Sequence, residues 1–212
     1  MVNLIPVKSP NWWKKLMPNR QWNFPENQGK IYLTFDDGPI PEVTPWVLDC
    51  LKEYQAKATF FCIGNNIEKH PEIFRRILEE GHQIGNHTQN HLNAFKVSSK
   101  VYLNNLNLAQ ETLYQQKAFT KLFRPPYGKL KRKQEKELLA KGFEIIMWSV
   151  LSKDYNPKIS PEQCLSNVLE HAGSGDIIVM HDSLKAMKNL KFSLPQILNH
   201  FTSKGYSFER ID

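Results

Sequence analysis

From residue 30 onward, the chain alternates short β-type runs with helical patterns. Apolar, β-branched or aromatic residues dominate seven runs, which fall at 30–35, 57–63, 82–86, 120–124, 143–150, 176–181 and 206–211. Strands that alternate with helices build βα units and a parallel sheet. The chain is too short for a full eight-unit barrel of typical size. We therefore expect an α/β fold, a distorted, incomplete (β/α) barrel with about seven parallel strands in a single domain.

Helix signals separate these runs. Capping residues and prolines predict helix starts at Thr44-Pro45, Pro71, Ser160-Pro161 and Ser193 to Pro195. Two longer polar–apolar stretches, 99–117 and 130–141, predict further helices, and Gly81, Gly142 and Gly205 predict helix ends. Because a helical pattern follows nearly every run, this spacing favours a parallel sheet.

The composition is that of one globular unit. Of 212 residues, 41% are hydrophobic and 23% charged, which suits a sizeable core. No apolar stretch approaches the roughly 18 residues that cross a bilayer, and the N-terminus lacks the apolar segment and cleavage site of a signal peptide. We expect no transmembrane segment; a cytoplasmic location and export by a segment not present here both remain open. The three cysteines form no CxxC pair and predict buried free thiols.

The net charge of +7 favours anionic partners in general terms. Its densest cluster, residues 129–136, is interleaved with glutamate and predicts a solvated helix face. No nucleic-acid-binding motif accompanies it, so we expect no nucleic-acid partner. Trp12 and Trp13 suit either packing on the barrel or contact with a membrane interface. We expect a monomer.

Polar residues follow several of the predicted strands. Chemistry in parallel α/β folds collects at the carboxyl ends of strands, where this sequence has Asp36, Asp37, His87, His91, Arg124, Asp154 and His181. Taken singly, each has another reading: a turn, a pair on a helix surface, a solvated arginine or a core histidine. Together, two histidines and a carboxylate suit a metal site with open positions, and the remaining groups suit metal-assisted hydrolysis.

Five ordered motifs carry a family resemblance. They are TFDDGP (34–39), HTQNH (87–91), RPPYG (124–128), WSVLSKDY (148–155) and IVMH (178–181), and the set resembles the polysaccharide deacetylases, the NodB-type carbohydrate esterases. The resemblance implies a catalytic domain at 30–212 after an N-terminal arm at 1–29. It also implies removal of acetyl groups from acetylated glycans with a bound divalent metal, which we expect to be Zn²⁺, with Co²⁺ and Ni²⁺ as alternatives.

Carried over residue by residue, the resemblance implies one group of roles around the metal. Asp37, His87 and His91 match the metal ligands of the family. Asp36 matches the general base, and Arg124 the cation that keeps this carboxylate ionised. The adjacent aspartates therefore receive different roles, because one binds the metal and the other takes a proton.

A second group of roles concerns the leaving group and the substrate. His181 matches the general acid, which Asp154 supports. The family match places an oxyanion-binding backbone N–H at Tyr127. We expect Tyr127, Trp148 and Tyr155 to stack on sugar rings.

The fourth motif departs from the family pattern Asp-x-x-Asp-Trp. Leu151 occupies the place of the first acid, and Tyr155 that of the tryptophan. Val179 replaces the usual leucine two places before His181. These changes leave the metal-binding half of the pattern intact and leave substrate preference open.

We expect a metal-dependent hydrolase that removes acetyl groups from an acetylated polysaccharide, most simply N-acetylglucosamine units of peptidoglycan or chitin-type oligomers. An O-acetyl glycan esterase, a small-molecule amidohydrolase and a catalytically silent glycan-binding relative remain alternatives. Retention of Asp36, Arg124 and His181 argues against the silent relative, because a binding module needs no base and acid together.

Overall fold

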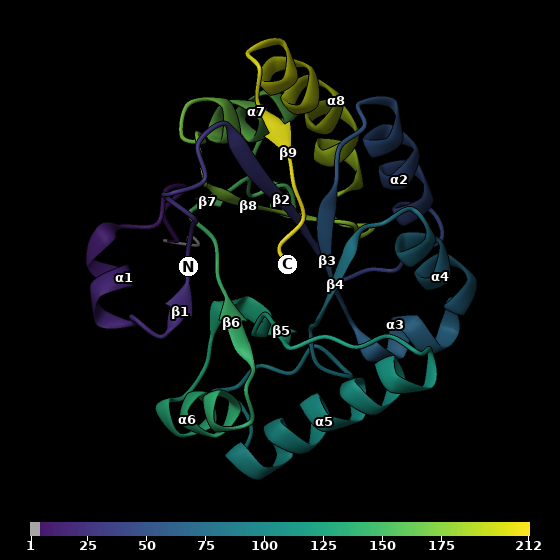
Figure 1. Ribbon diagram of the computed structural model, residues 1–212, viewed down its shortest axis with the longest axis vertical. Helices are drawn as coiled ribbons and strands as arrows, with labels where there is room; N and C mark the ends of the chain where they lie inside the picture. Colours follow the sequence, from purple (N-terminus) through teal and green to yellow (C-terminus); the bar gives the residue numbers. More distant parts are fainter. Residues whose placement is uncertain (1–4) are drawn as a thin grey trace.

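A curled parallel sheet inside a ring of helices forms the molecule (Figure 1). The computed structural model describes residues 5–212, so the first four residues of the expected arm lie outside the described part. The described strands follow the order β1-β6-β5-β4-β3-β2-β8-β7, and β9 pairs with β2. All of these pairings are parallel. The predicted incomplete (β/α) barrel is confirmed.

The strands are short and their bounds refine the predicted runs. They are β1 Arg20–Gln21, β2 Lys30–Asp36, β3 Ala58–Cys62, β4 Gln83–Asn86, β5 Leu122–Phe123, β6 Glu144–Ile146, β7 Val150–Leu151, β8 Ile177–His181 and β9 Ser207–Phe208. The single run expected at 143–150 therefore covers β6 and the first residue of a second strand, β7. These two strands do not pair with each other: β6 lies between β1 and β5, and β7 lies at the other end of the sheet, next to β8.

Residues from the expected N-terminal arm lie in the gap between β6 and β7. β1 pairs with β6, with Arg20 opposite Ile145, while the Leu151 N–H donates to the Val7 carbonyl at 2.8 Å. The Trp13 ring lies 6.2 Å from the Trp22 ring. This segment thus supplies part of the barrel wall.

The helices are α1 Asn11–Leu16, α2 Thr44–Glu53, α3 Gly64–Lys69, α4 Pro71–Glu79, α5 Ser99–Gln115, α6 Arg132–Ala140, α7 Pro161–Leu169 and α8 Met187–Ser203, with a 3₁₀ turn, η1, at Pro126–Gly128. Three predicted starts are confirmed. At one of them, the Ser160 hydroxyl accepts from the backbone N–H of Gln163 and caps α7. The predicted start at Ser193 to Pro195 is wrong, because α8 begins at Met187 and continues through the proline.

A continuous apolar stripe explains why α8 tolerates Pro195. A proline inside a helix costs about 3 kcal/mol, because it removes one backbone hydrogen bond and crowds the preceding turn. Leu190, Leu194, Ile197 and Leu198 are all fully buried on both sides of this position. Burying a leucine or isoleucine side chain stabilises the fold by about 1.5–3 kcal/mol, so this stripe outweighs the cost of the proline.

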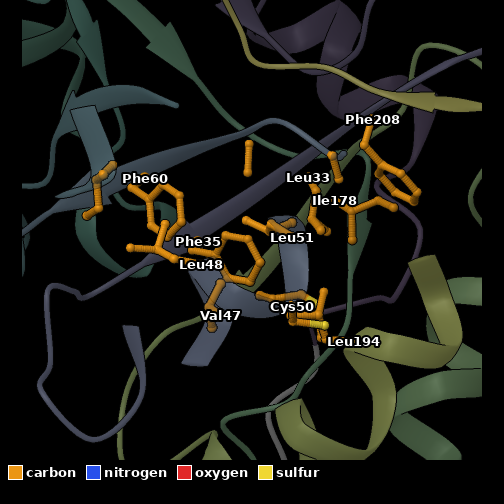
Figure 2. Packing of buried hydrophobic residues seen from close by; sticks show 14 of the residues in the cluster. Leu33, Phe35, Val47, Leu48, Cys50, Leu51, Phe60, Ile178, Leu194 and Phe208 are labelled. Atoms are coloured by element: carbon orange, nitrogen blue, oxygen red, sulfur yellow. The ribbon is translucent and has the colours of Figure 1, made fainter. Parts of the chain in front are cut away.

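Alternation along the strands sorts the residues into an outer and an inner set. In β2, Leu33 and Phe35 face outward and pack with Leu48 of α2 and Phe60 of β3 in the main core (Figure 2). The intervening Thr34 and Asp36 therefore face the barrel interior. The register also sets Asp36 opposite His181 of β8. Two residues of the expected site thus become neighbours through strand pairing alone.

The C-terminal segment crosses the amino end of the barrel, and the C-terminus lies near the middle of the ring in Figure 1. β9 pairs with the first residues of β2. Beyond it, the buried Ile211 donates its backbone N–H to the Thr59 hydroxyl at 2.9 Å. The polar residues expected at the carboxyl ends of the strands lie at the opposite end.

The remaining fold expectations concern membranes and thiols. Within residues 5–212, no helix has both the length and the apolar character of a membrane span. Cys50, Cys62 and Cys164 are free and buried, as predicted. Burial raises the pKa of Cys50 and of Cys164 to about 12, so both thiols are inert near neutral pH.

Candidate active site

Asp36 and Arg124 form a buried ion pair at the centre of the site. Arg124 Nη1 donates to Asp36 Oδ1 at 2.7 Å, and Arg124 is fully buried. The same Nη1 donates to the Thr34 hydroxyl at 2.6 Å, and Nη2 donates to the Met147 carbonyl at 2.8 Å. Burial alone would raise the pKa of Asp36, but the Arg124 charge lowers it below its usual value. Asp36 is therefore held as an anion in one orientation.

His87 presents one ring nitrogen to Asp37. Its Nδ1 lies 2.7 Å from the Arg124 carbonyl oxygen, which can only accept a hydrogen bond, so Nδ1 carries the proton. Nε2 is then a free lone pair, and it lies 3.7 Å from Asp37 Oδ1. Burial lowers the pKa of His87 to about 4, which keeps the ring neutral. A neutral imidazole whose Nδ1 is held by a hydrogen bond has its Nε2 lone pair oriented to bind a metal ion.

Asp37, His87 and His91 converge as the sequence predicted. One ligand atom from each lies within 4.8 Å of the others, and His91 Nε2 is 3.3 Å from Asp37 Oδ1. Within the described part of the chain, Asp37 Oδ1 is buried and accepts no hydrogen bond. A buried carboxylate oxygen without a donor, facing two imidazole nitrogens, fits a divalent cation.

The backbone around this cluster is strained. Outside glycine, five residues of the site loops have φ between 53° and 85°, namely Asp37, Thr88, His91, Tyr127 and Lys153. Such conformations cost of order 1–3 kcal/mol each and persist only where neighbouring contacts hold them. For Asp37, the Asn66 side chain donates to its carbonyl at 2.7 Å, and its own N–H donates to the Phe61 carbonyl at 3.3 Å. Holding these side chains in their observed directions therefore lowers the stability of the fold.

His181 and Asp154 form the second ion pair. His181 Nδ1 lies 2.8 Å from Asp154 Oδ1, and the His181 backbone N–H donates to Asp154 Oδ2 at 2.6 Å. Asp154 is fully buried. Burial alone would lower the pKa of His181, but the charge and hydrogen bond of Asp154 raise it to about 9. The imidazolium form therefore prevails at neutral pH, with Nε2 directed away from Asp154.

The three aromatic residues expected near the substrate occupy different environments. Tyr127 is 53% exposed, and its ring centroid is 4.6 Å from that of His91. Tyr155 packs against His181 with ring centroids 4.9 Å apart. Trp148 is only 7% exposed, and a β-carbon added at Gly128 would press on its ring. Trp148 is thus buried against the RPPYG loop and supports it, while about half of Tyr127 is exposed to solvent.

These motifs match a known family. The family model for polysaccharide deacetylase matches residues 24–146, which include the first three motifs. The chain belongs to the polysaccharide deacetylase family. The resemblance inferred from the five motifs and the prediction of a polysaccharide deacetylase are confirmed at this level.

Curated relatives of the family cover most of the chain. A peptidoglycan-N-acetylglucosamine deacetylase of Bacillus cereus is 37% identical over 196 residues, which are 88% of this chain and 88% of the relative. A chitooligosaccharide deacetylase of Azorhizobium caulinodans is 38% identical over 160 residues, 74% of this chain and 75% of the relative. The similarity therefore extends well beyond the motifs.

A solved deacetylase structure shows the same fold. It is a peptidoglycan N-acetylglucosamine deacetylase in complex with 4-naphthalen-1-yl-N-oxidanyl-benzamide, with a TM-score of 0.87 and 35% identity. The match covers 96% of this chain and 95% of the solved one. Because nearly the whole chain superposes, the N-terminal strand and the C-terminal segment both belong to this architecture.

Two buried residues of this candidate site were missed in the sequence. Thr34 lies two places before Asp36 on the same strand face and accepts a hydrogen bond from Arg124; the period of two would have found it. Asp182 follows His181, is fully buried and accepts from the Gly38 N–H at 2.9 Å. Burial raises the pKa of Asp182 to about 8. A carboxylate directly after an apolar strand was the available signal.

The altered fourth motif is apolar where the family pattern has its first acid. Leu151 lies in β7 opposite Val179 and is 2% exposed. Asp154 keeps its contact with His181 in spite of this change. The departure from the family pattern therefore leaves the acid pair in place.

Proposed function

We propose that this protein is a divalent-metal-dependent deacetylase that removes acetyl groups from N-acetylglucosamine units of a glycan of the peptidoglycan or chitin type. The proposal rests on one observation: the cluster of Asp37, His87 and His91 lies beside two ion pairs. These are Asp36–Arg124 and Asp154–His181. One pair holds a carboxylate as an anion, and the other holds an imidazole as a cation. A cation site with a base and an acid next to it suits hydrolysis of an acetamide.

Asp37, His87 and His91 would hold the metal, which in this setting would supply Lewis-acid polarisation of the acetyl carbonyl and of a water molecule. Nitrogen and oxygen ligands of this kind suit Zn²⁺, with Co²⁺ and Ni²⁺ as alternatives. The neutral, pre-oriented ring of His87 is already in its ligating form. Little rearrangement of the chain would then accompany metal binding.

Asp36 would act as the general base that takes the proton of the attacking water. Arg124 makes this role feasible in two ways, because it keeps the carboxylate ionised and fixes its orientation through Oδ1. The second oxygen, Oδ2, lies 4.0 Å from His87 Nε2. It therefore remains next to the cluster in which the water would be held.

His181 would protonate the departing amine. A pKa of about 9 keeps the imidazolium populated at neutral pH, and a general acid of this kind contributes roughly 10²–10⁴-fold to rate. The backbone N–H of Tyr127 would stabilise the oxyanion, since the left-handed φ of 60° turns this peptide at the rim of the site. The exposed Tyr127 ring offers a surface on which a sugar could stack.

The relatives support glucosamine-type glycans. Both curated relatives are named deacetylases of N-acetylated sugars, one of peptidoglycan and one of chitooligosaccharides. The retained base and acid favour catalysis over glycan binding alone. A release of acetate from O-acetylated glycans only, or from small amides only, would favour the esterase or amidohydrolase alternative.

Acetate release tests the proposal directly. The protein would be stripped of metal with a chelator and assayed on N-acetylglucosamine oligomers, peptidoglycan and acetylxylan, with and without added Zn²⁺, Co²⁺ or Ni²⁺. We expect no turnover in the stripped protein and recovery with a divalent ion on at least one N-acetylated glycan. Full activity in protein verified to be free of metal would refute the proposal.

A further inference from the structure

Asp182 forms hydrogen bonds with the turn that contains Asp37. Its Oδ1 accepts from the Gly38 backbone N–H at 2.9 Å, and its Oδ2 lies 2.6 Å from the Thr44 hydroxyl at the start of α2. Its own N–H donates to the Asp36 carbonyl at 3.1 Å. The residue therefore ties the end of β8 to the DDGP turn and to the first residue of α2.

The fit between this carboxylate and the turn is close. A β-carbon added at Gly38 would overlap the Asp182 side chain, so only glycine lets the turn approach it. The Thr44 hydroxyl also accepts from the Ile40 N–H at 2.8 Å, on the far side of the turn. Asp37, with φ of 85°, stands directly before this held segment. A left-handed backbone is uncommon outside glycine and persists only where neighbouring contacts hold it.

Asp182 differs from the other two buried carboxylates of the site, Asp36 and Asp154, in its partners. Asp36 faces Arg124, and Asp154 faces His181. Asp182 meets a backbone N–H and a hydroxyl, and among residues 5–212 no lysine, arginine or histidine forms an ion pair with it. Its two oxygens therefore hold the DDGP turn and the start of α2.

We propose that Asp182 is a positioning residue for the metal site: its side chain fixes the turn that aims Asp37. This inference rests on the proposed function. Residues behind a metal ligand typically alter metal affinity by about 10–100-fold when they are replaced.

A matched control lies at the other end of the same strand. Asp176 directly precedes β8, is 7% exposed and accepts from the Gly173 backbone N–H at 2.8 Å. Unlike Asp182, it pairs with a lysine, Lys8, at 2.7 Å, and it lies at the amino end of the barrel. Asp176→Asn therefore removes a comparable buried carboxylate at the far end of the barrel from the site.

The experiment measures the dissociation constants of Zn²⁺ and Co²⁺ by chelator competition in the full chain. We expect Asp182→Asn to weaken binding by about 10–100-fold, because a carboxamide has one acceptor oxygen and cannot accept from both the Gly38 N–H and the Thr44 hydroxyl. Asp176→Asn should leave binding unchanged. The Co²⁺ absorption bands should shift in Asp182→Asn only, because the direction of Asp37 changes. Thermal unfolding of both metal-free variants checks that each remains folded.

A second pair of variants keeps the test decisive if Asp182→Asn does not fold. Thr44→Val removes the hydroxyl next to Asp182 and should weaken metal binding, while Thr44→Ser retains the hydroxyl and should restore it. At saturating metal, the pH profile of Asp182→Asn should match that of the unaltered protein, because the His181–Asp154 pair is untouched.

The outcomes separate the inference from the proposed function. An unaltered protein that binds no divalent ion would overturn both. Normal binding by the unaltered protein together with equal affinities in Asp182→Asn and Asp176→Asn, or in Thr44→Val and Thr44→Ser, would overturn the role of Asp182 alone.

Discussion

The Asp36–Arg124 pair and the Asp154–His181 pair belong to one site, and burial acts on them in opposite directions. Burial would raise the pKa of Asp36 and lower the pKa of His181, so in both cases it favours the neutral form. Arg124 reverses the first effect and Asp154 reverses the second. The comparison shows how a single buried rim can hold an anion ready to accept a proton and a cation ready to give one.

The two pairs also differ in how firmly they are built into the fold. Arg124 is fully buried, lies 4.1 Å from the Phe61 ring and donates to the Ile146 and Met147 carbonyls as well as to Asp36. The His181 side chain is 15% exposed, and within residues 5–212 Asp154 is its one charged partner at hydrogen-bond distance. We infer that the arginine pair supports both stability and function, whereas the histidine pair serves function more than stability.

The largest expected losses of turnover come from two variants that distinguish a metal ligand from Asp36, the proposed base. His91→Ala removes one of three ligands, so it should lose metal and with it nearly all turnover. Asp36→Asn should retain the metal and still lose most turnover, because a carboxamide cannot take a proton. Metal analysis alongside acetate release distinguishes them. Equal metal depletion in both variants would mean that Asp36 is a ligand instead of a base.

Removal of the acid should cost less than removal of the metal. His181→Ala should lower kcat by roughly 10²–10⁴-fold, the usual contribution of general acid catalysis. Its metal content should stay that of the unaltered protein, since His181 lies outside the ligand cluster. Steady-state kinetics on an acetylated chito-oligomer provide the measurement, and a kcat close to that of the unaltered protein would exclude His181 as the acid.

For the free energy of unfolding, we expect the Asp36–Arg124 pair to matter more than the Asp154–His181 pair. Arg124→Met keeps much of the side-chain volume but leaves Asp36 buried without its cation, which should lower the free energy of unfolding by about 3–5 kcal/mol. His181→Ala should destabilise the protein less, because its side chain is partly exposed and Asp154 still accepts from the backbone N–H groups of Tyr155 and residue 181. Urea unfolding of the two metal-free variants makes the comparison. Similar losses in both would show that the pairs support the fold equally.

The sequence predicted where most of the candidate site residues lie, because its motifs follow strands. Parallel strands bring their carboxyl ends to one rim, so the positions of Asp36, His87, Arg124 and His181 followed from the order of the runs alone. The alternation within β2 also determines that Asp36 faces inward with Thr34. These inferences depend on periodicity, which is the strongest signal that a single sequence carries.

What escaped the sequence depended on tertiary contacts. β1 has two residues and no periodic pattern, and it exists because β6 leaves an edge on which it can pair. The early start of α8 depends on burial that outweighs Pro195. The near-complete burial of Trp148 depends on the RPPYG loop above it. Asp182 acquires its role from a glycine 144 residues away.

The smallest expected effect concerns Asp154, which acts through His181. Asp154→Asn should reduce kcat by only a fraction of the loss in His181→Ala. Because the two residues act as a unit, the double variant should be scarcely worse than His181→Ala alone. The same steady-state assay on the three variants gives the comparison, and losses that simply add would contradict the pairing.

The pH dependence of kcat/KM, measured for the unaltered protein and for Asp154→Asn, tests the central claim most directly. His181 is an acid only while protonated, and its raised pKa of about 9 means that activity should fall as the pH rises through that value. Without the Asp154 charge, burial dominates and lowers the pKa of His181, so the alkaline limb should move to lower pH. The account predicts that shift. An alkaline limb at the same pH in both proteins would contradict it.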